Sequence, residues 1–174
     1  MKNKLLISII IFFFFNFSGY AITKPPFENI FVAKNPIQYK DIIFEDFNGK
    51  LINLSNYNSK IYFLNFWATW CAPCKEEMPS LDQLQVVDGI EIFPINLEAK
   101  NQIKTKKFFE DLNIRNLSIY FIDPQLNLID LLTLRGLPTT VILNKDRKEI
   151  ARIIGPVDFS DKNFIAWINS ILLQ

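Results

Sequence analysis

Hydrophobic positions in this chain follow two spacings in turn, and the alternation predicts a layered α/β domain. Short runs rich in β-branched and aromatic residues predict strands, and apolar positions three and four apart predict helices between them. The expected strands are a hairpin over 41–54 with its turn at Asn48-Gly49, and runs at 60–67, 90–95, 117–122, 139–143 and 149–154. The expected helices are 73–87, 101–112, 124–134 and 159–173. Strands alternating with helices, followed by a terminal hairpin, indicate a mixed sheet flanked by helices.

The start of the chain has the pattern of an export signal. Two lysines precede an almost wholly apolar run over 5–17, and two small residues follow at the spacing of a cleavage site. The run is short for a membrane span of about 20 residues, although a few more residues make it a marginal one. We therefore expect residues 1–21 to be a signal peptide or a membrane anchor. Either one places the rest of the chain in the periplasm, soluble or tethered to the inner membrane.

Three prolines predict a linker after this segment. Pro25, Pro26 and Pro36 lie among mixed polar residues within 22–38. The folded domain is then expected over 39–174, as a single domain large enough to bury its own core. Charge is nearly balanced, with 19 Lys and Arg against 18 Asp and Glu, so nothing indicates nucleic acid as a partner.

The only two cysteines, Cys71 and Cys74, stand where a buried strand turns into a helix. A thiolate is the nucleophile in disulfide exchange, and the free N–H groups at a helix start favour negative charge. Pro73 suits the first turn of that helix. We therefore expect Cys71 to attack and the more buried Cys74 to resolve the mixed disulfide.

Other uses of the two cysteines are weaker. A structural disulfide of this spacing closes so small a loop that it adds little stability. A zinc site needs about four ligands, and the chain has two cysteines and no histidine, so no metal is expected. Buried bystander cysteines would not require a helix start beside them.

Two motifs resemble a known family. The stretch NFWATWCAPC at 65–74, continued by KEEMP, and the distant GLPTT at 136–140 resemble the thioredoxin-like reductases of the bacterial periplasm. The TlpA type is the nearest likeness, with ResA and CcmG as relatives. The resemblance covers the chain from about Tyr39 to its end. It implies a thioredoxin-like fold with an N-terminal hairpin and a central αβ insertion over about 97–122.

The resemblance also implies a docking surface. Pro138 would be a cis-proline packed against the dithiol, leaving the Leu137 backbone free to pair with an extended client segment. An ordinary trans-proline opening an edge strand is the alternative. Thr139 and the tryptophan beside the first cysteine, Trp70, are expected to contact the client, whereas Trp67 is expected in the core.

Glu77 is the candidate proton carrier. It follows Cys74 by three residues on the same helix face and matches the acid that ResA-type proteins hold near their cysteines. It could exchange a proton with the buried thiol, or it could be a solvated helix-start carboxylate, a role that suits Glu76 better. Cytoplasmic thioredoxin has a buried acid in the preceding strand, where this chain has Asn65, which cannot titrate.

These features together predict an exported thiol–disulfide oxidoreductase that needs no cofactor beyond the Cys71–Cys74 pair. The resemblance implies that the protein reduces cysteine pairs of client proteins in cytochrome c or cytochrome oxidase copper-site assembly, and we expect a monomer. A membrane thiol transporter would supply the electrons. Two alternatives stay open: an oxidant that introduces disulfides, and a metallochaperone that carries Cu(I) on the two thiolates.

Overall fold

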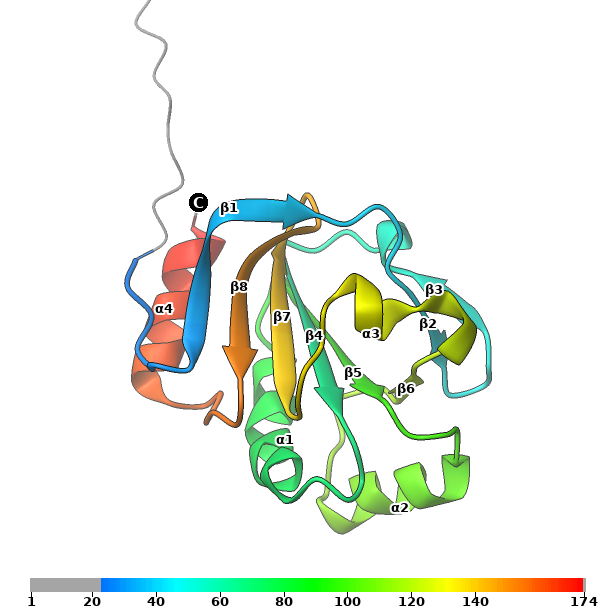
Figure 1. Ribbon diagram of the computed structural model, residues 1–174. Helices are drawn as coiled ribbons and strands as arrows, with labels where there is room; N and C mark the ends of the chain where they lie inside the picture. Colours follow the sequence, from blue (N-terminus) through cyan, green and yellow to red (C-terminus); the bar gives the residue numbers. More distant parts are fainter. Residues whose placement is uncertain (1–22, 174) are drawn as a thin grey trace, which may run out of the picture.

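A single mixed sheet forms the centre of the molecule (Figure 1). The computed structural model describes residues 23–173, and eight strands lie within them in the order β1-β8-β7-β4-β5-β6-β2-β3. The strands are β1 (Ile30–Gln38), β2 (Ile43–Asp46), β3 (Leu51–Asn53), β4 (Ile61–Trp67), β5 (Ile90–Asn96), β6 (Tyr120–Phe121), β7 (Thr139–Asn144) and β8 (Lys148–Ile154). The pairs β4–β5 and β5–β6 are parallel and the other pairs antiparallel, so the predicted mixed sheet is confirmed.

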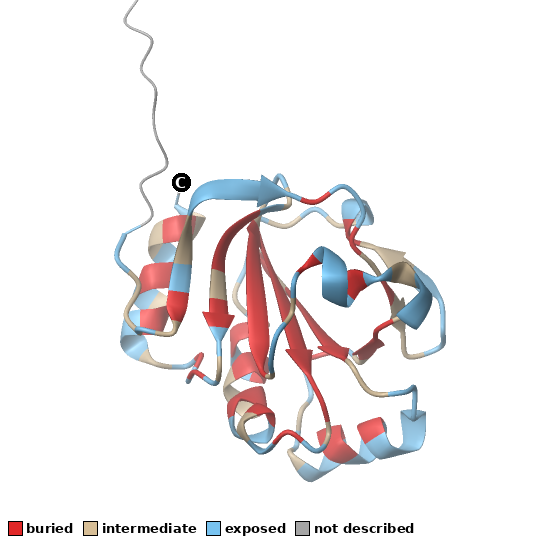
Figure 2. Cartoon of the chain, viewed as in Figure 1, coloured by how far each residue is buried: buried red, intermediate tan, exposed pale blue. Residues whose placement is uncertain are grey.

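Helices cover both faces of this sheet. They are η1 (Leu54–Asn56), α1 (Ala72–Leu84), α2 (Gln102–Asp111), η2 (Pro124–Leu126), α3 (Leu128–Leu131) and α4 (Lys162–Leu172). Residues of α1, α2 and α4 belong to one buried apolar cluster, and residues of η1 and α3 belong to a second. Figure 2 shows the central strands almost wholly buried between these layers and β1 largely exposed at the edge.

The central strand β4 determines which residues meet α1. All of its residues are buried, and successive side chains point to opposite faces. Ile61, Phe63 and Trp67 pack into the cluster with α1, whereas Tyr62, Leu64 and Phe66 pack into the cluster with α3. Asn65 has the parity of the first set, so the strand delivers one polar side chain to the face that also receives the cysteines.

The predicted linker over 22–38 is wrong for residues 30–38. Strand β1 pairs antiparallel with β8 and extends the sheet before Tyr39. Pro36 lies in the register shift between Val32 and Ile37, and an edge strand tolerates proline at such an irregularity. The export signal or anchor predicted for residues 1–21 lies outside the described residues. Within 23–173 no helix combines the length and apolar character that crossing a membrane requires.

Three other elements differ in extent from their predictions. Helix α1 ends at Leu84 instead of reaching 87, and α4 begins at Lys162 because Asp161 caps it. The helix predicted over 124–134 is divided into η2 and α3 by Asn127, whose φ of 49° is left-handed.

The strand predicted over 117–122 is limited to Tyr120–Phe121 for a different reason. The Asp82 carboxylate accepts backbone N–H groups from residues 115, 116 and 117 at 2.7–3.3 Å. The Leu117 N–H, at the start of the predicted strand, is therefore bound to α1 and does not join a strand ladder. The insertion formed by α2 and β6 is thus fastened to the helix that carries the dithiol.

Candidate active site

The two cysteines form a disulfide at the N-terminus of α1. Cys71 is the N-cap residue, and its Sγ accepts a hydrogen bond from the Cys74 backbone N–H at 3.3 Å. Pro73 lies in the first turn, where its missing N–H costs nothing. The helix start therefore directs a donor and its positive dipole end at the Cys71 sulfur, which favours a thiolate there after reduction.

The two cysteines differ in solvent exposure, and so do the two tryptophans near them in the sequence. Cys71 is 4% exposed and Cys74 0%, which matches the expected order. Trp70 is 70% exposed beside the first cysteine, whereas Trp67 is fully buried and packs on Phe108 of α2 at 4.6 Å between ring centroids. Trp70 thus offers a large apolar surface at the dithiol, and Trp67 is a core residue, as predicted.

Residues of the central insertion bind the loop that precedes the two cysteines. Glu98, after β5, accepts a hydrogen bond from the Thr69 backbone N–H and pairs with Lys104 of α2 at 2.7 Å. Burial opposes ionisation of Glu98, but these hydrogen bonds keep its pKa below the ordinary value. Sequence reasoning missed this residue. Its position just after the end of a strand parallel to β4 was the available signal, because such strand ends meet at one edge.

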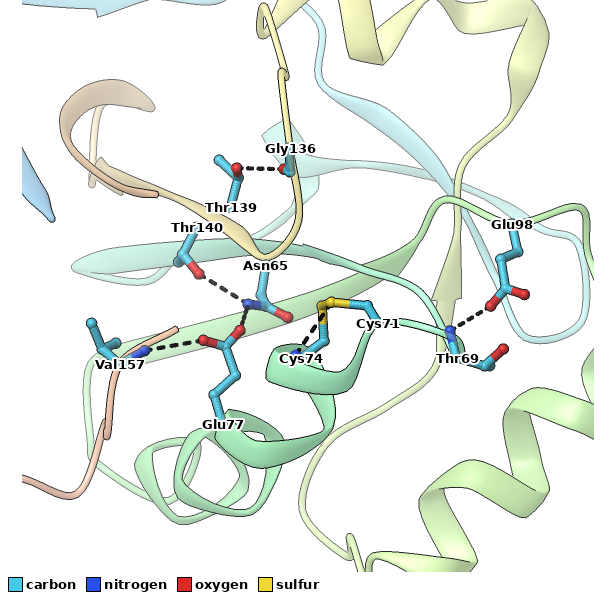
Figure 3. Close-up of a disulfide and its surroundings, with 10 residues drawn as sticks. All are labelled: Asn65, Thr69, Cys71, Cys74, Glu77, Glu98, Gly136, Thr139, Thr140 and Val157. Carbon is cyan, nitrogen blue, oxygen red and sulfur yellow. Dashed lines mark hydrogen bonds between the residues drawn. A yellow bond between two sulfur atoms is a disulfide. The ribbon is translucent and has the colours of Figure 1, made fainter. Parts of the chain in front are cut away.

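The second motif forms the turn that leads into β7. The Leu137–Pro138 bond is cis, as the resemblance implied, and Pro138 is buried. Leu137 is half-buried and packs against both apolar clusters. The Thr139 hydroxyl donates to the Gly136 carbonyl at 2.8 Å, so it closes this turn and does not face the sulfurs (Figure 3). Arg135 is exposed.

Glu77 lies beneath the dithiol and is 3% exposed. Its Oε1 accepts from Asn65 Nδ2 at 2.8 Å, and its Oε2 accepts from the Val157 backbone N–H at 3.3 Å. Burial raises the pKa of Glu77 to about 7, although both hydrogen bonds act in the opposite direction. The alternative of a solvated carboxylate is therefore wrong for Glu77, and its exposed neighbour Glu76 occupies that position.

Asn65 joins β4, α1 and β7 in one buried polar group. Its Nδ2 also donates to Thr140 Oγ1 at 2.9 Å, and the two residues are paired across the β4–β7 ladder. Figure 3 shows the Asn65 amide between the Glu77 carboxylate and the sulfur pair. The sequence identified Asn65 only as a residue that cannot titrate, and it did not indicate Thr140 or Val157.

A cysteine pair at a helix N-terminus and a cis-proline at the turn into a neighbouring strand of the same mixed sheet define the class of thioredoxin-like thiol–disulfide oxidoreductases. The chain belongs to the AhpC/TSA family, whose family model matches residues 37–151.

Curated relatives support the enzyme class. The thiol-disulfide oxidoreductase ResA of Bacillus anthracis is 31% identical over 161 residues, covering 88% of this chain and 90% of that one. ResA of Bacillus subtilis (strain 168) is 31% identical over 144 residues, covering 79% and 76%. This chain is accordingly a thiol–disulfide oxidoreductase, and cysteines of client proteins are its substrates in general.

Solved structures share the fold. A secreted thiol-disulfide isomerase from Corynebacterium glutamicum has a TM-score of 0.69 at 22% identity, over 90% of this chain and 99% of that one. StoA from Bacillus subtilis has a TM-score of 0.59 at 22% identity, over 74% and 96%. The thioredoxin-like fold expected from the motifs is therefore confirmed.

Proposed function

We propose that this protein is an exported reductant that opens disulfides in client proteins during cytochrome c or cytochrome oxidase copper-site assembly. The observation that carries the proposal is the Cys71–Cys74 disulfide at the start of α1, with the buried Glu77 beneath it. The relatives named thiol-disulfide oxidoreductase ResA support the exchange chemistry. The resemblance to the periplasmic thioredoxin-like reductases supports the reducing direction, and the TlpA likeness favours the copper side. The pattern of residues 1–21 supports export, with either a free or a tethered domain.

The reaction proceeds by two exchanges. In the reduced protein the Cys71 thiolate attacks one sulfur of a client disulfide, forming a mixed disulfide and releasing one client thiolate. Cys74 then loses its proton and attacks the Cys71 sulfur. The second client thiolate leaves, and the Cys71–Cys74 disulfide remains. The client gains two electrons, and the protein is oxidised to the state seen in the structure.

Each neighbouring residue has a role in these exchanges. Glu77, with its pKa near neutrality, takes the proton from Cys74 during the second exchange. The backbone at Leu137 pairs with an extended client segment, positioned by the cis-Pro138 turn that the Thr139 hydroxyl closes. Trp70 covers the client from the exposed side.

Electrons return through a membrane thiol transporter, which reduces the disulfide by the reverse exchange. We propose no organic cofactor or metal, because the cysteine pair itself holds the two electrons. We propose that the protein works as a monomer, since its client must approach the exposed side of the dithiol.

Trapping in cells tests the roles of the two cysteines. Cys74→Ala removes the resolving thiol, so mixed disulfides between Cys71 and clients should accumulate and disappear on treatment with a reductant. Cys71→Ala is the matched control, with the same chemical change three residues away, and should trap little. Equal trapping by the two variants would reverse or remove the assigned roles. Mass spectrometry of the captured partners identifies the clients.

The direction of electron flow has its own measurement. A glutathione redox titration of the purified domain should give a potential well below about −120 mV, the value of a strong periplasmic oxidant. A potential near that value would make the protein an oxidant that introduces disulfides, and the reducing role would be abandoned.

A further inference from the structure

In the oxidised protein the Asn65 side chain makes hydrogen bonds through its nitrogen, and none from the described residues reaches its oxygen. Nδ2 makes its two hydrogen bonds, to Glu77 and Thr140, but Oδ1 is buried and has no partner among the described residues. Figure 3 shows Oδ1 directed toward the sulfur pair. A buried carbonyl oxygen left without a donor is unfavourable, because it has lost its hydrogen bonds to water and gained none in return. A disulfide has no proton to donate, whereas a reduced Cys74 has one.

We propose that Asn65 is a positioning residue that couples Glu77 to the Cys74 thiol by turning its amide between two orientations. The inference rests on the proposed function, because it assigns Cys74 a thiol that must lose its proton during each cycle. Asn65 itself exchanges neither protons nor electrons.

In the first orientation Glu77 is ionised and Cys74 is protonated. Asn65 Nδ2 donates to the carboxylate, as in the structure, and Oδ1 accepts from the Cys74 S–H. In the second orientation Cys74 has lost one proton and Glu77 has gained one. The amide is turned by half a revolution, so that Oδ1 accepts from the Glu77 O–H and Nδ2 donates to the Cys74 thiolate. In both arrangements the proton on Cys74 or Glu77 has the amide oxygen as its acceptor, and the ionised group has the amide nitrogen as its donor.

The surroundings permit both orientations. The Thr140 hydroxyl accepts from Nδ2 in the first and can donate to Oδ1 in the second, because a hydroxyl does either. The Val157 N–H bonds the second oxygen of Glu77 in each case. An aspartate at position 65 could not do the same, since it would place a second carboxylate against Glu77.

Few other ionisable groups face this site. The elements packed around Glu77 present Asn65 from β4, Thr140 from β7 and the Val157 N–H from the segment after β8, and none of these titrates. Within α1, the charged neighbours Lys75 and Glu76 are exposed. The cysteines are therefore the titrating groups to which the Glu77 carboxyl responds.

A ¹³C NMR titration of the reduced protein, labelled at cysteine Cβ, tests the coupling. Glu77→Gln removes the competing negative charge and should lower the Cys74 pKa by about one unit. Asn65→Leu, which keeps the side-chain size, should raise the Cys74 pKa because the thiolate loses its donor. In the Asn65→Leu background, Glu77→Gln should then move the Cys74 pKa by less than about 0.3 unit.

Thr140→Val is the matched control for loss of a buried hydrogen bond. It removes one partner of the amide equally in both orientations, so it should lower stability and leave the response of Cys74 to Glu77→Gln intact. An equal response in the Asn65 and Asn65→Leu backgrounds would overturn the inference, because the coupling would then be direct. If Glu77→Gln leaves the Cys74 pKa unchanged, the inference is overturned as well.

A second measurement needs no variant and remains decisive if Asn65→Leu does not fold. The ¹⁵N signal of the Asn65 side-chain amide in the reduced wild-type protein should shift at the midpoints of both Glu77 and Cys74. A signal constant across both midpoints would overturn the inference. Failure of the proposed reducing role is seen separately, as an oxidising potential with the coupled titration unchanged.

Discussion

Two buried glutamates on opposite faces of the sheet differ in how their charge is matched. Glu149 is 6% exposed and is held by both Nε and Nη2 of Arg152 at 2.8 Å and by the Tyr39 hydroxyl at 2.6 Å. Glu77 is 3% exposed and has only neutral donors, an amide and a backbone N–H. Burial of a carboxylate without a cation favours its protonated form, which is why the pKa of Glu77 is raised to about 7.

The hydrogen bonds of the Glu149 group connect separate parts of the fold. Arg152 also donates to the Leu132 carbonyl at 2.7 Å, so the Glu149 group ties β8 to the segment after α3. The same group raises the pKa of Tyr39 to about 12, first through burial and then through the hydrogen bond to Glu149. The pKa of Arg152 is raised as well, by its hydrogen bond to Glu149, so Tyr39 and Arg152 stay in one charge state over the physiological range. Burial alone therefore does not distinguish the two carboxylates, whereas the presence or absence of a matching cation does.

Disrupting the Glu149–Arg152 ion pair should have the largest effect on stability. Arg152→Met keeps the apolar stem but leaves Glu149 buried without its cation, which should lower the free energy of unfolding by about 3–5 kcal/mol. Urea denaturation of the oxidised protein measures it, and the Cys71 and Cys74 titrations of the reduced protein should not change. Lys107→Met removes an exposed pair with Asp111 and should leave the urea midpoint unchanged. Similar midpoints for the two variants would contradict the structural role of the Glu149 group.

The unpaired carboxyl should give a smaller effect that depends on pH. Folding raises the pKa of Glu77 from 4.5 to about 7, so the folded state holds its proton more tightly than the unfolded state. The stabilisation from this group is therefore present below about pH 4.5 and is lost as the pH rises to about 7. Relative to Glu77→Gln, the oxidised wild-type protein should lose about 3 kcal/mol over that range.

Urea denaturation at several pH values between 4.5 and 8 measures this difference. Glu76→Gln is the matched control, because the same substitution at the exposed neighbour should reproduce the wild-type dependence. A wild-type curve parallel to that of Glu77→Gln would mean that Glu77 does not titrate in this range, and its role as proton carrier would fail.

Local patterns predicted the parts of the fold that depend on local chemistry. The apolar run at 60–67, the proline at 73 and the turn at Asn48-Gly49 each specify one conformation, and β4, the start of α1 and the β2–β3 hairpin follow. Strand β1 was missed because Lys34, Asn35 and Pro36 interrupt its apolar sequence, and it forms a strand where β8 supplies a partner edge. The short β6 follows from a distant carboxylate, Asp82, which no local pattern shows.

In the candidate site, too, some residues are predicted by local motifs and others depend on the tertiary fold. The cysteines and the turn at Leu137-Pro138 are carried by motifs, so their positions could be anticipated. The state of Glu77 could not, because it depends on burial under Val157, which is 80 residues away in the chain. Asn65 is an ordinary strand residue until β7 and α1 place Thr140 and Glu77 against its amide.

The most direct measurement is a ¹³C NMR titration of the Glu77 side-chain carboxyl in the oxidised protein. With the disulfide closed, neither thiol titrates, so the midpoint reports burial and hydrogen bonding alone. We expect a midpoint near pH 7. A midpoint at the ordinary glutamate value, below about 5, would show that Glu77 remains ionised throughout, and it would remove the proton carrier from beneath Cys74.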